Sequence, residues 1–378
     1  MTDTTTNTED EVTPPPQKQR VSNDDLYRNS TQFELWSFTM ENLQETKRKA
    51  NEKGAKSARE KFNQAFEQAK QENPAIFEQY PDELNDSMIS LVTAEEESTF
   101  LDFYIQNITT TCNFFKMPTQ VRLTAASFFK KFYLVNSVME FHPKNVLYTC
   151  IFLAAKSENY FISIESYVKA LKGTDKAHIL DLEFIVLQSL KFTLLVHHPI
   201  RPLYGFFLDF QALLLHPEQL MYDVSVDTLG NLYNSAKEWL NKYFMVSDVG
   251  FLFTPPQIAL AAMYDTDRRI TEKYLKRKFL KDEGKLEAIP EGETEEEKPK
   301  EEPESKPEPT NREQYESLVK LIKRCIRIAK QSQVADREAS KEIDKKCFFA
   351  LDPKKLISRK IKRLTSADTA KEGSVDPK

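Results

Sequence analysis

Two charged side chains lie in stretches of this sequence that are otherwise apolar. Lys156 ends the run LYTCIFLAAK, and Glu183 lies within ILDLEFIVLQSLKF. At helical spacing their neighbours are mostly apolar, namely Thr149, Phe152 and Leu153 for Lys156, and Leu180, Leu187 and Leu190 for Glu183. Such a charge can form a hydrogen bond to a partner that is desolvated with it, which stabilises a complex by about 1.5–3 kcal/mol. The alternative, with no role in binding, is that Lys156 is a solvated lysine that complements a helix dipole.

Residues suited to catalysis or metal binding do not form a recognisable site. His142, His197 and His198 have no carboxylate or cysteine beside them at ligand spacing, so we interpret them as turn histidines next to prolines. The four cysteines are far apart within amphipathic patterns, which predicts neither a disulfide framework nor a zinc site. No nucleophile elbow, paired catalytic carboxylates or dinucleotide fingerprint occurs. The sequence therefore predicts a protein that is not an enzyme and holds no metal or cofactor.

The composition predicts a soluble, intracellular and helical protein. Of 378 residues 40% are hydrophobic, which suffices for sizeable cores, and 8 are glycine, which disfavours phosphate-binding loops. No run approaches the roughly 20 apolar residues that cross a bilayer, so no membrane association is expected. Aromatic residues surround two lysines in SFFKKFYL, and we interpret this segment as a buried helix with Lys130 and Lys131 reaching solvent rather than as a nucleic-acid surface.

Charge is unevenly distributed within the net value of −5. The segment 282–309 is acidic and rich in proline, and the helices that follow it, from KLIKRCIRIAK to KKLISRKIKRL, are strongly basic. The basic block is consistent with a localisation signal, a partner contact, a nucleic-acid footprint or a self-neutralising pair with the acidic segment. We favour localisation or partner contact and expect no direct sequence-specific binding to nucleic acid.

Helical periodicity and capping residues predict two successive sets of five helices. Thr93 and Glu96 form a capping box for the first helix. The expected helices lie within 94–115, 117–136, 142–156, 163–173 and 175–192 for the first set, and within 201–215, 217–246, 254–267, 270–280 and 312–330 for the second. The fold class is therefore all-α, with two five-helix units in tandem and extra helices at both ends.

The predicted domain boundaries follow from this pattern. They are a disordered N-terminus at 1–23, an aromatic cluster and extension helix at 24–92, a first five-helix unit at 93–197, a second at 198–334 with a disordered acidic insert at 282–309, basic helices at 335–364, and a disordered tail at 365–378.

At this level of detail the sequence resembles the cyclins, whose two cyclin boxes are each five-helix bundles, and in particular the cyclins of the H type. The segment YRNSTQFELWSF resembles the N-terminal signature of that type, through Tyr27, Asn29, Ser30, Gln32, Trp36 and Phe38. KKFYLVNSVMEFHPKNVLYTCIFLAAK, LLVHHPIRPLYGFFLDF and LFTPPQIALAAM resemble segments of the two boxes. Together the resemblance covers most of residues 26–280.

The resemblance implies a kinase-binding surface. In cyclins a lysine and a glutamate at the positions of Lys156 and Glu183 hold the regulatory helix of a cyclin-dependent kinase. Apolar contacts would come from Leu153, Leu187, Phe192 and Leu194. Cyclins usually place two acidic residues shortly after the lysine, and this chain has Glu158 followed by Asn159.

The function implied by the resemblance is that of a non-catalytic activator. The expected partners are the cyclin-dependent kinase of general transcription factor TFIIH, a RING-finger assembly subunit and the TFIIH core, in the nucleus. The kinase would phosphorylate the carboxy-terminal repeats of RNA polymerase II, and also other cyclin-dependent kinases. The alternatives are a cyclin of the C, K or T type for another transcription kinase, and a TFIIB-like adaptor without a kinase, although the chain lacks the CxxC pairs of a zinc ribbon.

Overall fold

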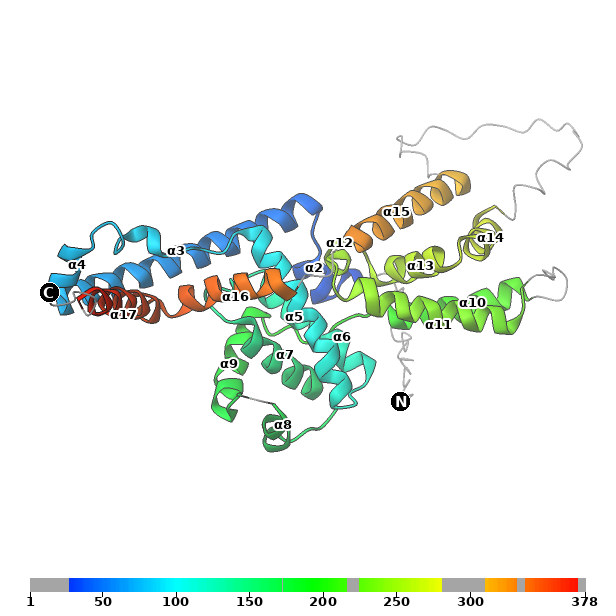
Figure 1. Ribbon diagram of the computed structural model, residues 1–378. Helices are drawn as coiled ribbons and strands as arrows, with labels where there is room; N and C mark the ends of the chain where they lie inside the picture. Colours follow the sequence, from blue (N-terminus) through cyan, green and yellow to red (C-terminus); the bar gives the residue numbers. More distant parts are fainter. Residues whose placement is uncertain (1–26, 172, 216–223, 281–309, 332–336, 373–378) are drawn as a thin grey trace, which may run out of the picture.

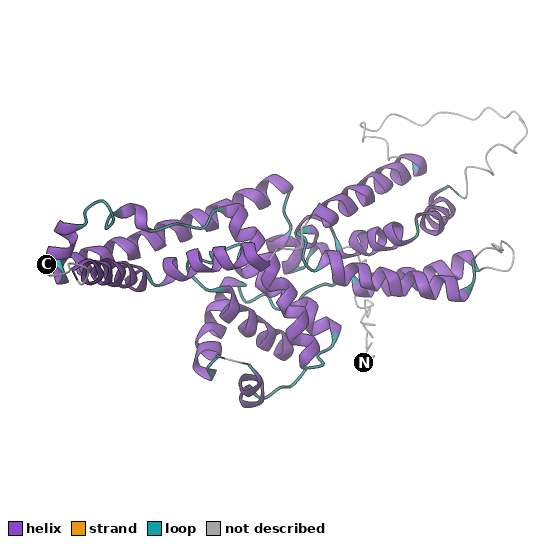
Figure 2. Cartoon of the chain, viewed as in Figure 1, coloured by secondary structure: helices purple, strands orange, loops and turns teal. Residues whose placement is uncertain are grey.

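A computed structural model describes residues 27–171, 173–215, 224–280, 310–331 and 337–372, and within these ranges the chain consists of helices and loops (Figures 1 and 2). The predicted disordered N-terminus, the acidic insert and the last residues of the predicted tail lie outside the described residues. Among the described helices, none combines the length and the apolar character needed to cross a membrane. The molecule is elongated, with the two five-helix units side by side and a helical arm at one end (Figure 1).

The first five-helix unit forms as the sequence predicts. Its helices are α5 (Ala94–Phe114), α6 (Thr119–Phe132), α7 (Pro143–Ser157), α8 (Ile164–Ala170) and α9 (Lys176–Ser189). The capping box of Thr93 and Glu96 is present at the start of α5. α7 packs against both α6 and α9 and contributes a run of fully buried residues, so it is the central helix of the first core.

The second unit has the same five-helix plan with two short additional elements. Its main helices are α10 (Ile200–Leu214), α11 (Val226–Trp239), α13 (Pro255–Thr266), α14 (Arg268–Phe279) and α15 (Asn311–Gln331). A π-helical turn, η3 (Leu240–Phe244), extends α11, and α12 (Val249–Leu252) precedes α13. A capping box of Thr254 and Gln257, with proline in the first turn, begins α13 at the central position of the second core.

The arm pairs the two ends of the chain. The long helix α3 (Met40–Glu72) packs against α17 (Pro353–Glu372) and α16 (Arg337–Leu351), and α4 (Pro74–Gln79) covers the tip (Figure 1). A separate small core there contains Phe62, Phe77 and Ile357. The sequence predicted the last helix to end at 364, with a disordered tail from 365. That boundary is wrong, because α17 continues to Glu372.

The extension helix is also fixed directly to the first unit. Asn51 Nδ2 donates to Glu97 Oε2 at 2.5 Å, and Glu97 Oε1 accepts from the Val138 amide at 2.7 Å. Gly54 makes the close approach possible, since a Cβ there would lie 2.2 Å from the Cβ of Ser137. α3 is therefore an integral part of the fold rather than a free surface helix.

Candidate functional site

The two charged residues singled out by the sequence meet across α7 and α9. Lys156 Nζ lies 2.7 Å from Glu183 Oε1 and 3.0 Å from Oε2. The same ammonium lies 4.4 Å from the centre of the Phe152 ring, a cation–π contact. The Lys156 side chain is 50% exposed and that of Glu183 is 17% exposed. The pair is preassembled at the surface and accessible from outside.

An exposed apolar surface adjoins this pair. Phe192 is 62% exposed and Phe184 is 59% exposed, and their ring centres lie 6.4 Å apart. Lys191 and Phe192 both have positive φ, 53° and 56°, and the Phe192 amide donates to the Leu187 carbonyl. Left-handed backbone costs a non-glycine residue about 1–2 kcal/mol. The same left-handed turn ends α5 at Lys116 and α7 at Asn159, so it is a helix C-terminal turn, and after α9 it leaves the Phe192 side chain exposed to solvent.

The other predicted apolar contacts lie deeper than the sequence suggested. Leu153 is 3% exposed and belongs to the first core, so it does not form part of the accessible surface. Leu187 and Leu194 are partly buried and pack against the same core. We conclude that Leu153 supports the surface from beneath, because the face of α7 that carries it packs on neighbouring helices.

Glu158 forms hydrogen bonds within the chain. Its carboxylate accepts from Gln120 Nε2 and from Thr124 Oγ1, each at 2.6 Å. Thr124 Oγ1 is also 2.7 Å from His198 Nε2. Because the single hydroxyl proton of Thr124 goes to Glu158, His198 must donate from Nε2. Burial lowers the pKa of His198 to about 3, in keeping with a neutral ring. Glu158 therefore has a structural role at the junction of the two units, and its contact with the kinase stays a prediction.

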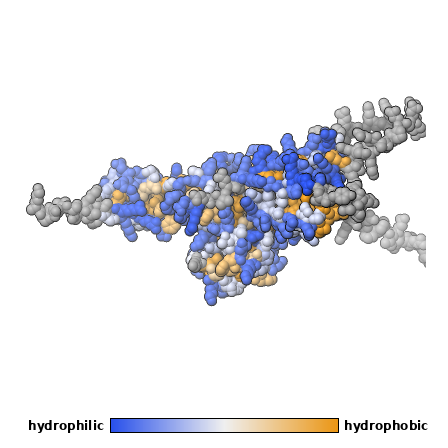
Figure 3. All heavy atoms as spheres, turned by 45° about the vertical axis from the view of Figure 1, so that its right-hand side comes forward, coloured by the Kyte–Doolittle hydropathy of each residue, from blue (hydrophilic) through white to orange (hydrophobic). Residues whose placement is uncertain are grey.

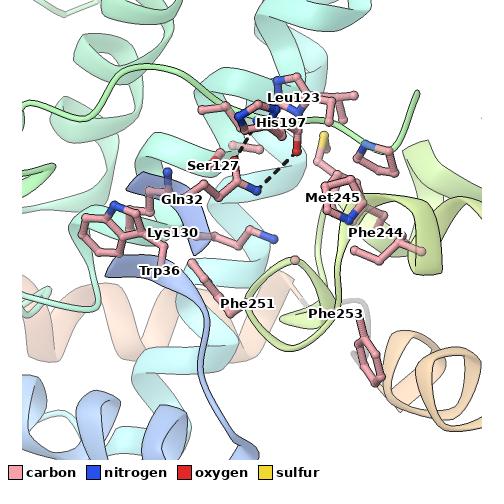
Figure 4. A pocket seen from close by; sticks show the side chains of 18 residues that line it. Gln32, Trp36, Leu123, Ser127, Lys130, His197, Phe244, Met245, Phe251 and Phe253 are labelled. Atoms are coloured by element: carbon pink, nitrogen blue, oxygen red, sulfur yellow. Dashed lines mark hydrogen bonds between the residues drawn. The ribbon is translucent and has the colours of Figure 1, made fainter. Parts of the chain in front are cut away.

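The N-terminal signature holds the two units together. Gln32 donates from Nε2 to the His197 carbonyl at 3.3 Å and accepts from the His197 amide at 2.7 Å (Figure 4). Trp36 is 2% exposed, and its Nε1 donates to Thr193 Oγ1 at 2.9 Å. Gln32 and Trp36 lie on the short helix α2 (Thr31–Trp36). The signature thus binds to the segment that leads from the first unit to the second.

Three of the remaining signature residues, Tyr27, Ser30 and Phe38, form contacts on either side of α2. Ser30 caps the helix by accepting from the Phe33 amide, and its hydroxyl donates to the Tyr27 carbonyl. The Phe38 amide donates to the Phe251 carbonyl of α12 at 2.8 Å, so the segment also reaches the second unit. Asn29 is exposed, and no hydrogen bond joins its side chain to another described residue. The N-terminal aromatic cluster therefore docks against both five-helix units.

The structure buries Lys131, which the sequence predicts to reach solvent. It does not reach solvent, because it is 2% exposed and its Nζ lies 5.3 Å from the centre of the Trp36 ring. Burial lowers its pKa to about 8. Lys130 donates to the Ser247 carbonyl at 2.8 Å and is partly buried between the two units (Figure 4). The lysines therefore belong to the internal contact that α2 covers.

Sequence reasoning missed part of the exposed surface. Phe184, which directly follows Glu183 in the chain, and Leu195 were not predicted as surface residues, yet both are exposed. A usable signal was present, since residues 179–189 of α9 are apolar on more sides than one core face requires. Within the described residues, no cluster of three or more histidine, cysteine, aspartate or glutamate side chains could hold a metal ion.

Comparison with known proteins identifies the family. The cyclin N-terminal domain model matches residues 76–195, and the cyclin C-terminal domain model matches residues 198–330. The chain is 38% identical over 284 residues to cyclin CCL1 of Saccharomyces cerevisiae, covering 74% of this chain and 68% of that protein. The chain is a cyclin of the H type. The two five-helix units are accordingly its first and second cyclin boxes.

Further similar proteins support the same family assignment. Cyclin mcs2 of Schizosaccharomyces pombe is 37% identical over 256 residues, covering 68% of this cyclin and 74% of the relative. Among solved structures, a chain of the yeast TFIIK complex of Kin28, Ccl1 and Tfb3 superposes with a TM-score of 0.56 at 30% identity, covering 80% of this cyclin and 100% of that chain. A chain of the Chaetomium thermophilum CAK complex has a TM-score of 0.62 at 23% identity, covering 94% and 98%, which supports the fold.

Proposed function

We propose that this cyclin is the regulatory subunit that binds and activates the cyclin-dependent kinase of TFIIH. The observation that carries the proposal is the charged pair beside an exposed aromatic surface, in a chain similar to the Ccl1-containing yeast complex. Activation would promote phosphorylation of the carboxy-terminal repeats of RNA polymerase II, and of other cyclin-dependent kinases. The cyclin itself would contribute no catalytic group.

The physical basis of activation is a rigid docking platform. A protein kinase is active when the regulatory helix of the kinase is placed so that an ion pair in its own active site forms. The Lys156 ammonium and the Glu183 carboxylate can donate to and accept from backbone and side-chain groups of that helix. On docking, Phe184 and Phe192 would each bury apolar surface and so stabilise the complex by about 1.5–3 kcal/mol.

We further propose that a RING-finger assembly subunit and the TFIIH core join the complex, and that it acts in the nucleus. The yeast complex contains a third protein, Tfb3, which supports a ternary arrangement. Fluorescence microscopy of the tagged cyclin in its own cells tests the location, and uniform cytoplasmic signal would contradict it.

The decisive experiment is affinity purification of the tagged cyclin from its own cells, with mass spectrometry and an assay on polymerase repeat peptides. We expect a cyclin-dependent kinase, a RING-finger protein and repeat phosphorylation that depends on the cyclin. A kinase of another transcription complex would point to the C, K or T type. Recovery of polymerase or DNA without any kinase would make the protein a TFIIB-like adaptor and would overturn the proposal.

A further inference from the structure

A row of cations runs along the exposed face of α15. Its members are spaced at i, i+3, i+4 and i+7, so they lie on one side of the helix, and all are exposed: Lys320, Lys323, Arg324 and Arg327. The opposite side of α15 is buried in the second core through Ile322, Cys325 and Ala329. We call the four cations the basic stripe.

The basic stripe is not neutralised by the described part of the chain. Neighbouring cations of α15 do have partners, since Lys330 pairs with Asp265 and Arg312 with Glu316. None of the four stripe residues forms an ion pair with a described residue. Two described anions lie near the stripe: Glu316, which is four residues before Lys320 on α15 and pairs with Arg312, and Glu41 at the start of α3, whose carboxyl pKa is lowered by hydrogen bonds to its own backbone and Thr39, with Arg324 a smaller influence. Four adjacent cations repel one another, which favours an anionic occupant.

The same chain carries a segment of the opposite charge directly before this helix. Residues 282–309 contain 12 acidic and 4 basic residues, a net charge of −8. Both neighbours of this segment are anchored, because it follows α14 and precedes α15, and α14 packs against α15. The excess negative charge of the segment exceeds the four positive charges of the stripe, so full neutralisation is possible.

We propose that the acidic segment 282–309 binds to the basic stripe of α15 within the same molecule. Lys320 lies ten residues after Thr310, about 15 Å along the helix. Arg327, at the far end of the stripe, lies about 25 Å along the helix from Thr310, and a flexible chain of 28 residues has a root-mean-square span of about 29 Å, so the segment as a whole can reach the entire stripe. Attachment gives it an effective concentration in the millimolar range.

A nucleic acid is the less suitable occupant. The whole chain has a net charge of −5, and the tethered segment would compete with phosphate groups for the same four cations. The bound segment therefore covers the basic stripe and neutralises its charge, which we call an electrostatic mask. Other polyanions then meet a nearly neutral α15. This inference is independent of kinase binding, and its test involves no kinase.

Zero-length cross-linking of the purified full-length cyclin tests the proposal directly. A carbodiimide joins a carboxylate to an amine when the two are in contact, and mass spectrometry identifies the linked peptides. We expect links from residues 282–309 to Lys320 and Lys323, falling several-fold between 50 and 500 mM salt. The matched controls are Lys354 and Lys362 of α17, which are also exposed but lie in the arm far from α15 (Figure 1). Equal linkage at the control lysines, or none at the stripe, would overturn the proposal.

A second measurement distinguishes the two polyanions. Binding of a fluorescent 20-base-pair duplex is followed by anisotropy for the wild type, for Glu295, Glu296 and Glu297 changed to Gln, and for the four stripe cations changed to Gln. We expect weak binding to the wild type and at least tenfold tighter binding to the Glu→Gln variant, since its mask is weakened. Tight binding to the wild type that needs the stripe but is unchanged by Glu→Gln would show that nucleic acid, and not the segment, occupies α15.

Discussion

The two cyclin boxes carry the same kind of ion pair in different surroundings. Lys156 and Glu183 join the third and fifth helices of the first box, and Asp265 and Lys330 join the third and fifth helices of the second. Both pairs have an N–O distance of 2.7 Å, and the lysines are 50% and 46% exposed. An accessible bridge between these helices is therefore a feature of the five-helix plan and does not by itself indicate a binding site.

The surroundings distinguish the two pairs. Beside Lys156 and Glu183 lie the exposed aromatic side chains of Phe184, on α9, and of Phe192, which left-handed backbone positions just after α9. In the second box, Asp265 also accepts from Trp239 Nε1 at 2.7 Å, and Trp239 is buried, so that pair is linked to the core. Figure 3 shows apolar residues in separate areas among hydrophilic ones on the face in view. The comparison suggests that a charged pair becomes a docking site when apolar surface surrounds it.

The largest expected effect comes from reversing the lysine of each pair. Lys156→Glu should weaken kinase binding by about 3–5 kcal/mol, because Glu183 would be left with a like charge and no partner when desolvated in the interface. Lys330→Glu is the matched control and should change kinase affinity less than threefold. Titration calorimetry with the purified kinase measures both. Equal losses in the two variants would remove the distinction between the boxes.

Truncating the aromatic surface should have the next largest effect. Phe184→Ala should lower kinase affinity by about tenfold to a hundredfold, since a ring that becomes buried in the complex contributes about 1.5–3 kcal/mol. Tyr204→Ala in the second box removes a ring of similar exposure and should leave affinity unchanged. Both variants should retain their thermal unfolding midpoints within a few degrees. If Tyr204→Ala were the more damaging, the kinase surface would lie in the second box.

The junction between the boxes should respond to pH through His198. The folded pKa of about 3 lies below the ordinary value of about 6.5, so acid protonates the unfolded chain first and stability is lost as pH falls below 6.5. Between pH 7 and 5 this amounts to about 2 kcal/mol. His198→Gln removes this contribution while keeping a donor for Thr124.

The measurement is urea unfolding of the wild type and His198→Gln at both pH values. Between pH 7 and pH 5 the unfolding free energy of the wild type should fall by about 2 kcal/mol more than that of the variant. Comparing the two proteins removes the contributions of the other titrating groups, which are the same in both. Asp102 illustrates why a difference is needed. Burial raises its pKa to about 7, so the folded protein gains stability from protonating Asp102 as pH falls over the same range. Identical pH dependence in both proteins would show that His198 is not held neutral.

The smallest effect on stability is expected from exchanging the two charges of the first pair. The double variant Lys156→Glu with Glu183→Lys restores an ion pair between α7 and α9, so unfolding free energy should stay within about 1 kcal/mol of the wild type. Kinase binding should nevertheless remain weak, because each charge would face the wrong group of the partner. Recovery of full binding would mean that the pair acts on the cyclin fold alone.

Much of the helical framework was predictable from local sequence. Apolar periodicity and capping residues such as Thr93 and Glu96 act within one or two turns, so the ten principal helices were recognised without knowledge of their neighbours. The end of α17 was missed because TSADTAKE lacks an apolar face strong enough to predict a helix. The pairing of Lys156 with Glu183 came from the resemblance to cyclins, since the residues are 27 positions apart.

The sequence by itself therefore determined that the chain forms two five-helix units and which helical faces are apolar. The tertiary structure decided what covers each face. Lys131 looked exposed on its own helix but is covered by Trp36, a residue 95 positions earlier, and Glu158 looked available but is bound by Thr124. The physical reason is that periodicity specifies the direction of a side chain relative to its helix axis, whereas burial and hydrogen bonding depend on segments that only the folded chain brings near.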